Sequence, residues 1–244
     1  MQQQKPNPPD TIRVEERHGH GQPPAKTNVA RRRILRLVAL FAALAVTAWL
    51  VNHDWNRPQA DADLIPVVTA EKAGDVESLR QAAASGNATV AARAIAGLAA
   101  VGGTQARSDV ERALTDRRPE LRHAAAAEFS RVTDRHNVAP LNKALASDGN
   151  PMVRAAAARS LGELRSWNGL DRLLASMDDP DPFVRRAASD AVQNILGLRF
   201  QFDPHGQEQD RRRVIAQVRA ELPRLRPAYE AYMRKLESAQ ESTP

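Results

Sequence analysis

The chain has 244 residues, of which 42% are hydrophobic, 4% are aromatic and none is cysteine. Without cysteine it can form no disulfide, thiolate metal site or cysteine nucleophile, and an alanine-rich, aromatic-poor composition favours packed helices over a β-sandwich. Residues 1–60 hold 9 of the 35 Lys and Arg but 4 of the 29 Asp and Glu, so the remainder is nearly neutral and lacks the basic excess of a nucleic-acid-binding domain.

The first predicted element is a membrane anchor. Residues 1–30 are rich in proline and glutamine without apolar periodicity, which predicts a disordered tail. Three arginines then precede residues 34–51, which are apolar except for Arg36 and would span about 27 Å as a helix, close to the roughly 30 Å of a bilayer core. We predict a transmembrane helix over 31–52 that acts as a signal anchor.

The charge flanking this segment predicts its orientation. Basic residues lie before it and only Arg57 follows closely, so the tail is expected in the cytoplasm and the rest of the chain on the extracytoplasmic, periplasmic side. Residues 53–74 are expected to form a linker. The alternative is a signal peptide cleaved near Ala60-Asp61-Ala62, but this site lies far beyond the apolar core.

A repeat of 31 or 32 residues follows. Positions Val90, Leu121, Val153 and Val184 mark its register, and apolar residues recur four, eight and eleven positions later in each copy. These offsets trace one face of an α-helix. Apolar residues eleven or twelve positions before each mark predict a first helix, and Gly, Asn, Asp or Pro residues predict the turn between the two. Residues 75–197 are therefore expected to form about four helical hairpins that bury one another's apolar faces.

Past the array, residues 198–240 predict capping helices. Two helical stretches, near 207–222 and 226–240, are separated by Pro223 and Pro227, and they carry an apolar face. This face includes Leu222, Leu225, Tyr229, Tyr232, Met233 and Leu236.

The repeat pattern resembles a known family. The segment from Asp148 to Leu164, DGNPMVRAAAARSLGEL, and the segment from Asp179 to Val192 resemble the short bacterial HEAT repeat, the type also found in phycobilisome-lyase-like HEAT proteins. The expected fold is thus all-α: an α-solenoid of about four HEAT-like hairpins with C-terminal capping helices, preceded by one transmembrane helix. The resemblance also implies a structural inter-repeat ladder of hydrogen bonds between Asp and Arg side chains, carried here by Asp116, Arg122, Asp148, Arg154, Asp179 and Arg185.

No catalytic motif is visible: the chain lacks a Walker A loop, an H-E-x-x-H motif and a G-x-S-x-G motif. We expect no enzyme activity, no cofactor, no metal and no nucleic-acid partner. The favoured function is a membrane-anchored scaffold that binds a protein or peptide partner on its concave surface; the alternative, from the resemblance, is a lyase-like or chaperone-like subunit that assists chromophore or protein maturation. Positions two, six and ten after the register marks are expected to line the partner surface: His123, Arg131, Arg159, Glu163, Arg186, Asp190 and Asn194.

Overall fold

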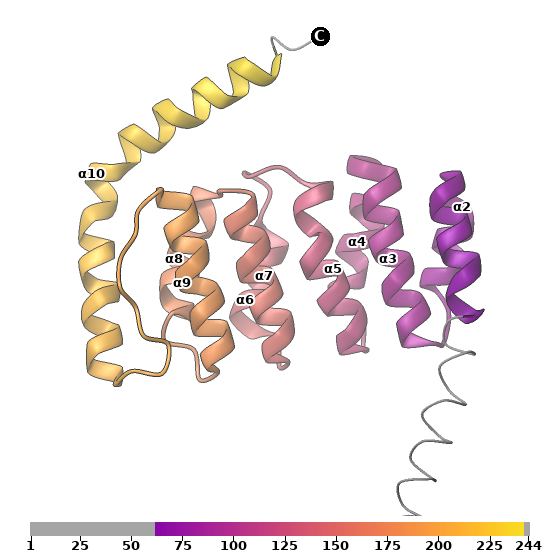
Figure 1. The fold of residues 1–244 in the computed structure, drawn as a ribbon, viewed down its shortest axis with the longest axis horizontal. Coiled ribbons are helices and arrows are strands. Elements are labelled where there is room, and N and C mark those ends of the chain that lie inside the picture. The colour runs from indigo at the N-terminus through magenta and orange to yellow at the C-terminus, as the bar shows by residue number, and fades with distance from the viewer. Residues whose placement is uncertain (1–61, 242–244) are drawn as a thin grey trace, which may run out of the picture. The chain divides into compact units, whose positions relative to one another are not determined.

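A computed structural model describes residues 62–241 of the chain, and all regular secondary structure in this range is helical (Figure 1). The predicted tail and the predicted transmembrane helix over 31–52 lie outside this range, and the alternative cleavage site near Ala60-Asp61-Ala62 lies at its edge. Among the described helices, none combines the length and the apolar character that a membrane crossing needs. The prediction of an anchor therefore rests on the sequence.

Within the described range, eight helices pair into four consecutive hairpins, which makes residues 76–196 a HEAT-like helical-repeat array. In Figure 1 the second helix of each hairpin lies in front and the first helices of the later hairpins lie behind, so the array has two layers. The hairpins are α2 (Val76–Ala83) with α3 (Ala88–Gly102), α4 (Arg107–Ala113) with α5 (Pro119–Val132), α6 (Ala139–Ser147) with α7 (Pro151–Glu163), and α8 (Leu170–Ser176) with α9 (Pro182–Leu196).

The second helices begin where the turn residues indicate. Proline occupies the first turn of α5, α7 and α9, where its missing N–H leaves no hydrogen bond unmade and its fixed φ suits the helix. The side chains of Asn150 and Asp181 accept hydrogen bonds from the backbone N–H of Met152 and Phe183, which satisfies donors that have no partner inside the helix. Local chemistry therefore determines where each hairpin turns.

The core is built largely from alanine and leucine in register. The register marks Leu121, Val153 and Val184 are at most 2% exposed, and the small residues of α7, Ala155 to Ala158, are all buried. Small residues allow the second helices to approach closely: a Cβ placed on Gly162 of α7 would lie 2.9 Å from the Cα of Ala191 in α9. One register position differs from the prediction, because Val101, near the end of α3, is partly exposed.

Two predictions about the ends of the array are wrong. Residues 62–73, expected to belong to a linker, are helical, and their stripe of Leu64, Val67 and Ala70 packs against the core. The prolines at 223 and 227 do not separate two helices, because α10 runs continuously over Glu208–Glu241 with both prolines inside it.

Figure 1 shows the axis of α10 changing direction partway along its length, as expected where proline removes a backbone hydrogen bond and crowds the preceding turn. The helix stays continuous because both prolines are exposed and each half of it has buried residues of its own. Ile215 and Val218 are buried before the bend, and Met233 is buried after it.

Candidate binding groove

The six ladder residues lie in the loops and first turns that face one another along the array. The Nε and Nη2 atoms of Arg122 donate to the two carboxylate oxygens of Asp148 at 2.7 and 3.0 Å, and Arg154 binds Asp179 in the same bidentate way at 2.9 and 2.8 Å. Each arginine also donates from Nη1 to the backbone carbonyl of the aspartate in its own hairpin, Asp116 or Asp148. These arginines therefore tie each hairpin to the next.

The ladder is closed differently at each end. In the last hairpin, Arg185 meets no further aspartate and donates instead to the backbone carbonyls of Asp179 and Pro204. In the first hairpin, no arginine is available at position 91, which is Ala91. There Arg118 of the following loop binds the Asp116 carboxylate and the Ser85 carbonyl, a substitution that the repeat pattern did not predict.

The ionisation of the ladder fits a structural role. Burial acts to raise the pKa of Asp148, but the hydrogen bonds from Arg122 and Asn150 and the nearby arginine charges hold that pKa below its ordinary value. The hydrogen bond to Asp148 in turn raises the pKa of Arg122. Both groups therefore stay charged and paired at neutral pH, whereas a general acid or base needs a pKa near the working pH in order to exchange a proton.

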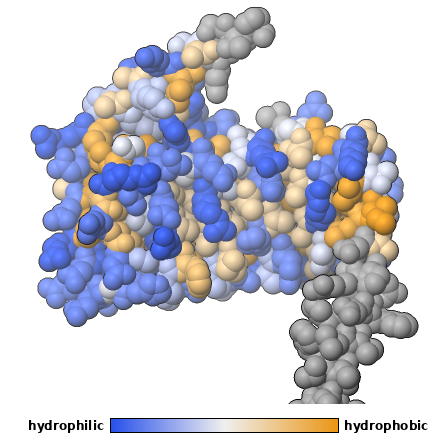
Figure 2. Space-filling view, in the orientation of Figure 1, coloured by the Kyte–Doolittle hydropathy of each residue, from blue (hydrophilic) through white to orange (hydrophobic). Residues whose placement is uncertain are grey.

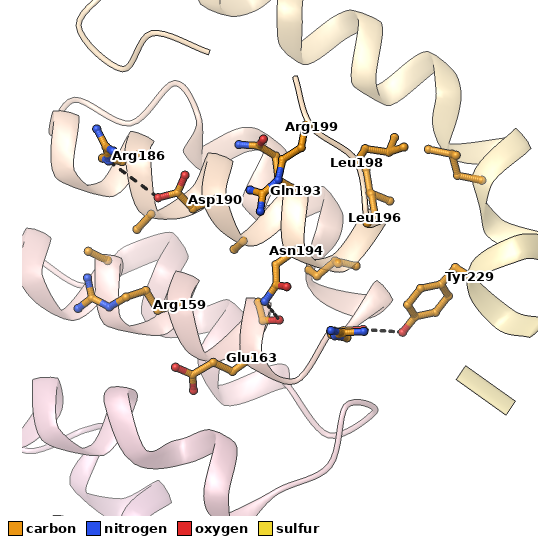
Figure 3. Close-up of a pocket in the computed structure, with 18 of the residues that line it drawn as sticks. Arg159, Glu163, Arg186, Asp190, Gln193, Asn194, Leu196, Leu198, Arg199 and Tyr229 are labelled. Atoms are coloured by element: carbon orange, nitrogen blue, oxygen red, sulfur yellow. Dashed lines mark hydrogen bonds and ion pairs between the residues drawn. The ribbon is translucent and has the colours of Figure 1, made fainter. Parts of the chain in front are cut away.

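A groove of about 860 Å³ lies over the last two hairpins, between α7, α9 and the second half of α10 (Figure 3). The segment Leu196–Arg199, which leaves the end of α9, forms part of its wall. Five of the seven predicted surface residues line this groove: Arg159, Glu163, Arg186, Asp190 and Asn194.

The other two predicted residues lie elsewhere. His123 on α5 is half-buried and its Nε2 atom has no hydrogen-bond partner in the described structure; burial, aided by the charge of Arg159, lowers its pKa, so at neutral pH its imidazole is uncharged. Arg131 is exposed and pairs with Glu128 at 2.9 Å on its own helix. Neither residue lines the groove.

The polar residues of the groove differ in how they are held. Asn194 donates from Nδ2 to the carbonyl of Gly162 at 3.0 Å, so it stabilises the α7–α9 contact, and Glu163 accepts a hydrogen bond from Ser130. Arg186 makes only a long 3.9 Å contact with Asp190, and both side chains are exposed. Arg159 has no carboxylate partner among the described residues, which leaves its guanidinium available to a ligand.

The second half of α10 is fixed to the array by a set of contacts that the sequence interpretation missed. Arg165, just after α7, has a left-handed backbone with φ of 49°, and its carbonyl accepts a hydrogen bond from the Tyr229 hydroxyl at 2.5 Å. Its guanidinium donates to the Tyr232 hydroxyl at 2.7 Å and lies 5.5 Å from the centre of that ring. The Tyr229 ring also packs on Trp167, with centroids 4.9 Å apart. The predicted apolar face of α10 identified the two tyrosines, but nothing in the repeat pattern indicated Arg165.

The family model of HEAT repeats matches residues 138–199, which are the third and fourth hairpins and carry most of the groove. No curated protein matches the chain. Among solved structures, a chain of the complex of CpcE and CpcF of phycocyanin lyase from Nostoc sp. PCC7120 is similar at 23% identity, over 62% of this chain and 99% of that chain, with a TM-score of 0.45.

Proposed function

We propose that this HEAT-like helical-repeat protein is a scaffold, without enzyme activity of its own, that binds a protein or peptide partner in the groove over its last two hairpins. The observation that carries the proposal is the gathering of exposed apolar side chains at this groove. Of the six large hydrophobic residues that are exposed in the described structure, four line it: Met152, Phe183, Leu198 and Tyr232. Exposed apolar patches with a polar rim are typical of protein interaction sites.

The chemistry of the groove supports binding over catalysis. Its charged groups are arginines and two carboxylates, no histidine, serine or threonine lines it, and Arg165 engages the hydroxyls of its two tyrosines. The described residues contain no group of three or more acidic or histidine side chains suited to hold a metal ion. Hydrolytic or transfer chemistry needs a nucleophile and a base within hydrogen-bond reach of each other. Shape and charge in this groove instead suit recognition of a partner chain.

The cellular setting of the scaffold is part of the same proposal. The apolar segment 34–51 anchors the chain in a membrane, and the basic residues before it place the repeats on the extracytoplasmic side. The partner would then be an extracytoplasmic protein, or the extracytoplasmic part of a membrane protein.

A photo-crosslinking amino acid at position 183 tests the binding surface in cells, because Phe183 is 71% exposed at the rim of the groove. The matched control is the same amino acid at Ile65, which is 63% exposed at the other end of the array. We expect a discrete adduct from position 183 that Arg159→Glu with Arg186→Glu removes. The same adducts from both positions, or adducts that the double variant leaves unchanged, would refute the proposed surface.

A further inference from the structure

We infer that the groove takes a peptide segment that combines large apolar side chains with carboxylates. This inference rests on the proposed function and specifies the chemistry of the partner. It follows from three properties of the groove: where its apolar residues lie, which of its charges are unpaired, and how far it extends.

The apolar contacts follow the length of α9. Phe183 and Met152 lie in the first turns of α9 and α7, while Leu198 follows the end of α9 and Tyr232 lies on the opposite wall. The 15 residues of α9 correspond to about 22 Å at the rise of an α-helix. A partner that covers all of these residues therefore needs about four helical turns or six to seven extended residues, which is the size of a peptide segment. Figure 2 shows a largely hydrophilic face on which the strongest apolar colour gathers toward the two ends of the array.

The charges around these apolar residues are unbalanced. Four arginines line the groove against two carboxylates. Arg159 and Arg199 have no ion-pair partner in the described part of the chain. By contrast, Arg122 and Arg154 of the ladder are paired with aspartates, and Arg211 at the start of α10 is paired with Asp178 at 2.6 Å. Glu163 is already engaged by Ser130. In Figure 3 the Arg159 side chain lies below the Arg186–Asp190 pair and the Arg199 side chain lies to its right, beside Gln193.

A partner with acidic side chains is complementary to this excess of arginines. Carboxylates on a bound segment would pair with Arg159 and Arg199 where apolar contacts exclude water, and charge-assisted hydrogen bonds in such places are stronger than on an open surface. The same surplus of arginines would repel a basic partner. The groove therefore discriminates by charge while its apolar residues supply the contact area.

Selection from a random peptide library tests the inference without assuming a sequence. The full chain, held in lipid nanodiscs, would be the target, with empty nanodiscs for subtraction. We expect the selected peptides to be enriched in Leu, Ile, Phe or Met together with Asp or Glu. Fluorescence anisotropy of one synthetic selected peptide would then give its dissociation constant for each variant.

The variants form matched pairs. Phe183→Ser is expected to weaken binding at least tenfold, and Arg159→Glu or Arg199→Glu about fivefold each. The controls are Ile65→Ser, and Arg172→Glu on the exposed face of α8; both are expected to leave the constant within twofold. Replacing the peptide's acidic residues with lysine should restore binding to Arg159→Glu. All these side chains are exposed, and circular dichroism would show that each variant keeps the helical fold.

The possible results separate this inference from the proposed function. Selected peptides that depend on Phe183 but are basic or uncharged would overturn the acidic chemistry and leave the peptide scaffold intact. If no selected peptide is sensitive to Phe183→Ser, both proposals fall. Binding of oleate with the same dependence on Phe183 and Arg159, in the absence of any such peptide, would also overturn both, because it would identify the groove as a lipid site.

Discussion

Replacing Arg122 with alanine should destabilise the array far more than replacing an exposed groove arginine. Arg122 makes a bidentate bond with Asp148 and donates to the carbonyls of Asp116 and Arg117, and the two charged side chains are only 19% and 7% exposed. Its removal leaves the Asp148 carboxylate with the backbone N–H of Asn150 as a remaining donor. Loss of one partner from a buried pair costs about 3–5 kcal/mol. Because Arg122 keeps some contact with water, we expect about 3 kcal/mol.

The assay is thermal unfolding of the full chain, followed by circular dichroism at 222 nm. A loss of about 3 kcal/mol corresponds to a fall in Tm of roughly 6–12 °C for a domain of this size. The control is Arg186→Ala, which removes only the 3.9 Å contact between two exposed side chains, so its effect should stay below about 1 kcal/mol. Equal falls in Tm for the two variants would show that the ladder does not hold the hairpins together.

The same pair predicts a pH dependence. The folded-state pKa of Asp148 lies below its ordinary value, so the unfolded chain takes up this proton first as the pH falls. The stability that the pair supplies is therefore complete above the unfolded pKa of about 3.9 and is lost as the pH falls through the lower folded-state pKa. The difference in Tm between the wild type and Arg122→Ala should narrow only below about pH 4; a difference that narrows between pH 8 and pH 5 would contradict the assignment.

Three further predictions concern packing, topology and the alternative function. Gly162→Ala should lower the stability by about 1–2 kcal/mol through overpacking, since its Cβ would meet the backbone of Ala191; Gly97→Ala, whose Cβ would meet the flexible end of the Leu79 side chain, should be close to neutral in the same unfolding measurement. Because the chain has no cysteine, single cysteines at Gln4 or Ala146 can be labelled in intact cells with a membrane-impermeant maleimide. Labelling of the Ala146→Cys variant alone is expected, and labelling of Gln4→Cys alone would reverse the orientation. Adding a bilin to the purified chain should leave the chromophore's absorption band unshifted, because the chain offers no thiol and few aromatic side chains to hold it; a shifted band would favour the lyase-like alternative.

The helical array was predictable from the sequence because its information is local and repeated. Spacings of 31 and 32 residues fix the register, and proline in the first turn of three second helices marks their start independently. The exposed Val101 shows the limit of this pattern, since it lies near the end of α3, where fewer neighbours cover the helix. The same register brings five residues of the predicted partner surface to the groove, because they recur at fixed offsets on the second helices.

The ends of the array were not predictable in this way because tertiary packing outweighs local preference there. Residues 62–73 precede the first repeat and were expected to belong to a linker, but a three-residue apolar stripe packs this helix against the core. Pro223 and Pro227 suggest a break, but buried residues on both sides hold α10 together. Arg165 was missed because its role depends on two tyrosines more than 60 positions later, a distance that no repeat pattern reports.

The way the ladder ends determines how the array can grow. Arg185 would bind the aspartate of a fifth hairpin, but its Nε atom is already used by the carbonyl of Pro204, in the loop that leads into α10. A hairpin appended after α9 would have to displace that loop and the helix that follows it. A copy of the third hairpin inserted between α7 and α8 would find an arginine before it and an aspartate after it. Lengthening by internal duplication is therefore compatible with this fold, and lengthening at the carboxyl end is not.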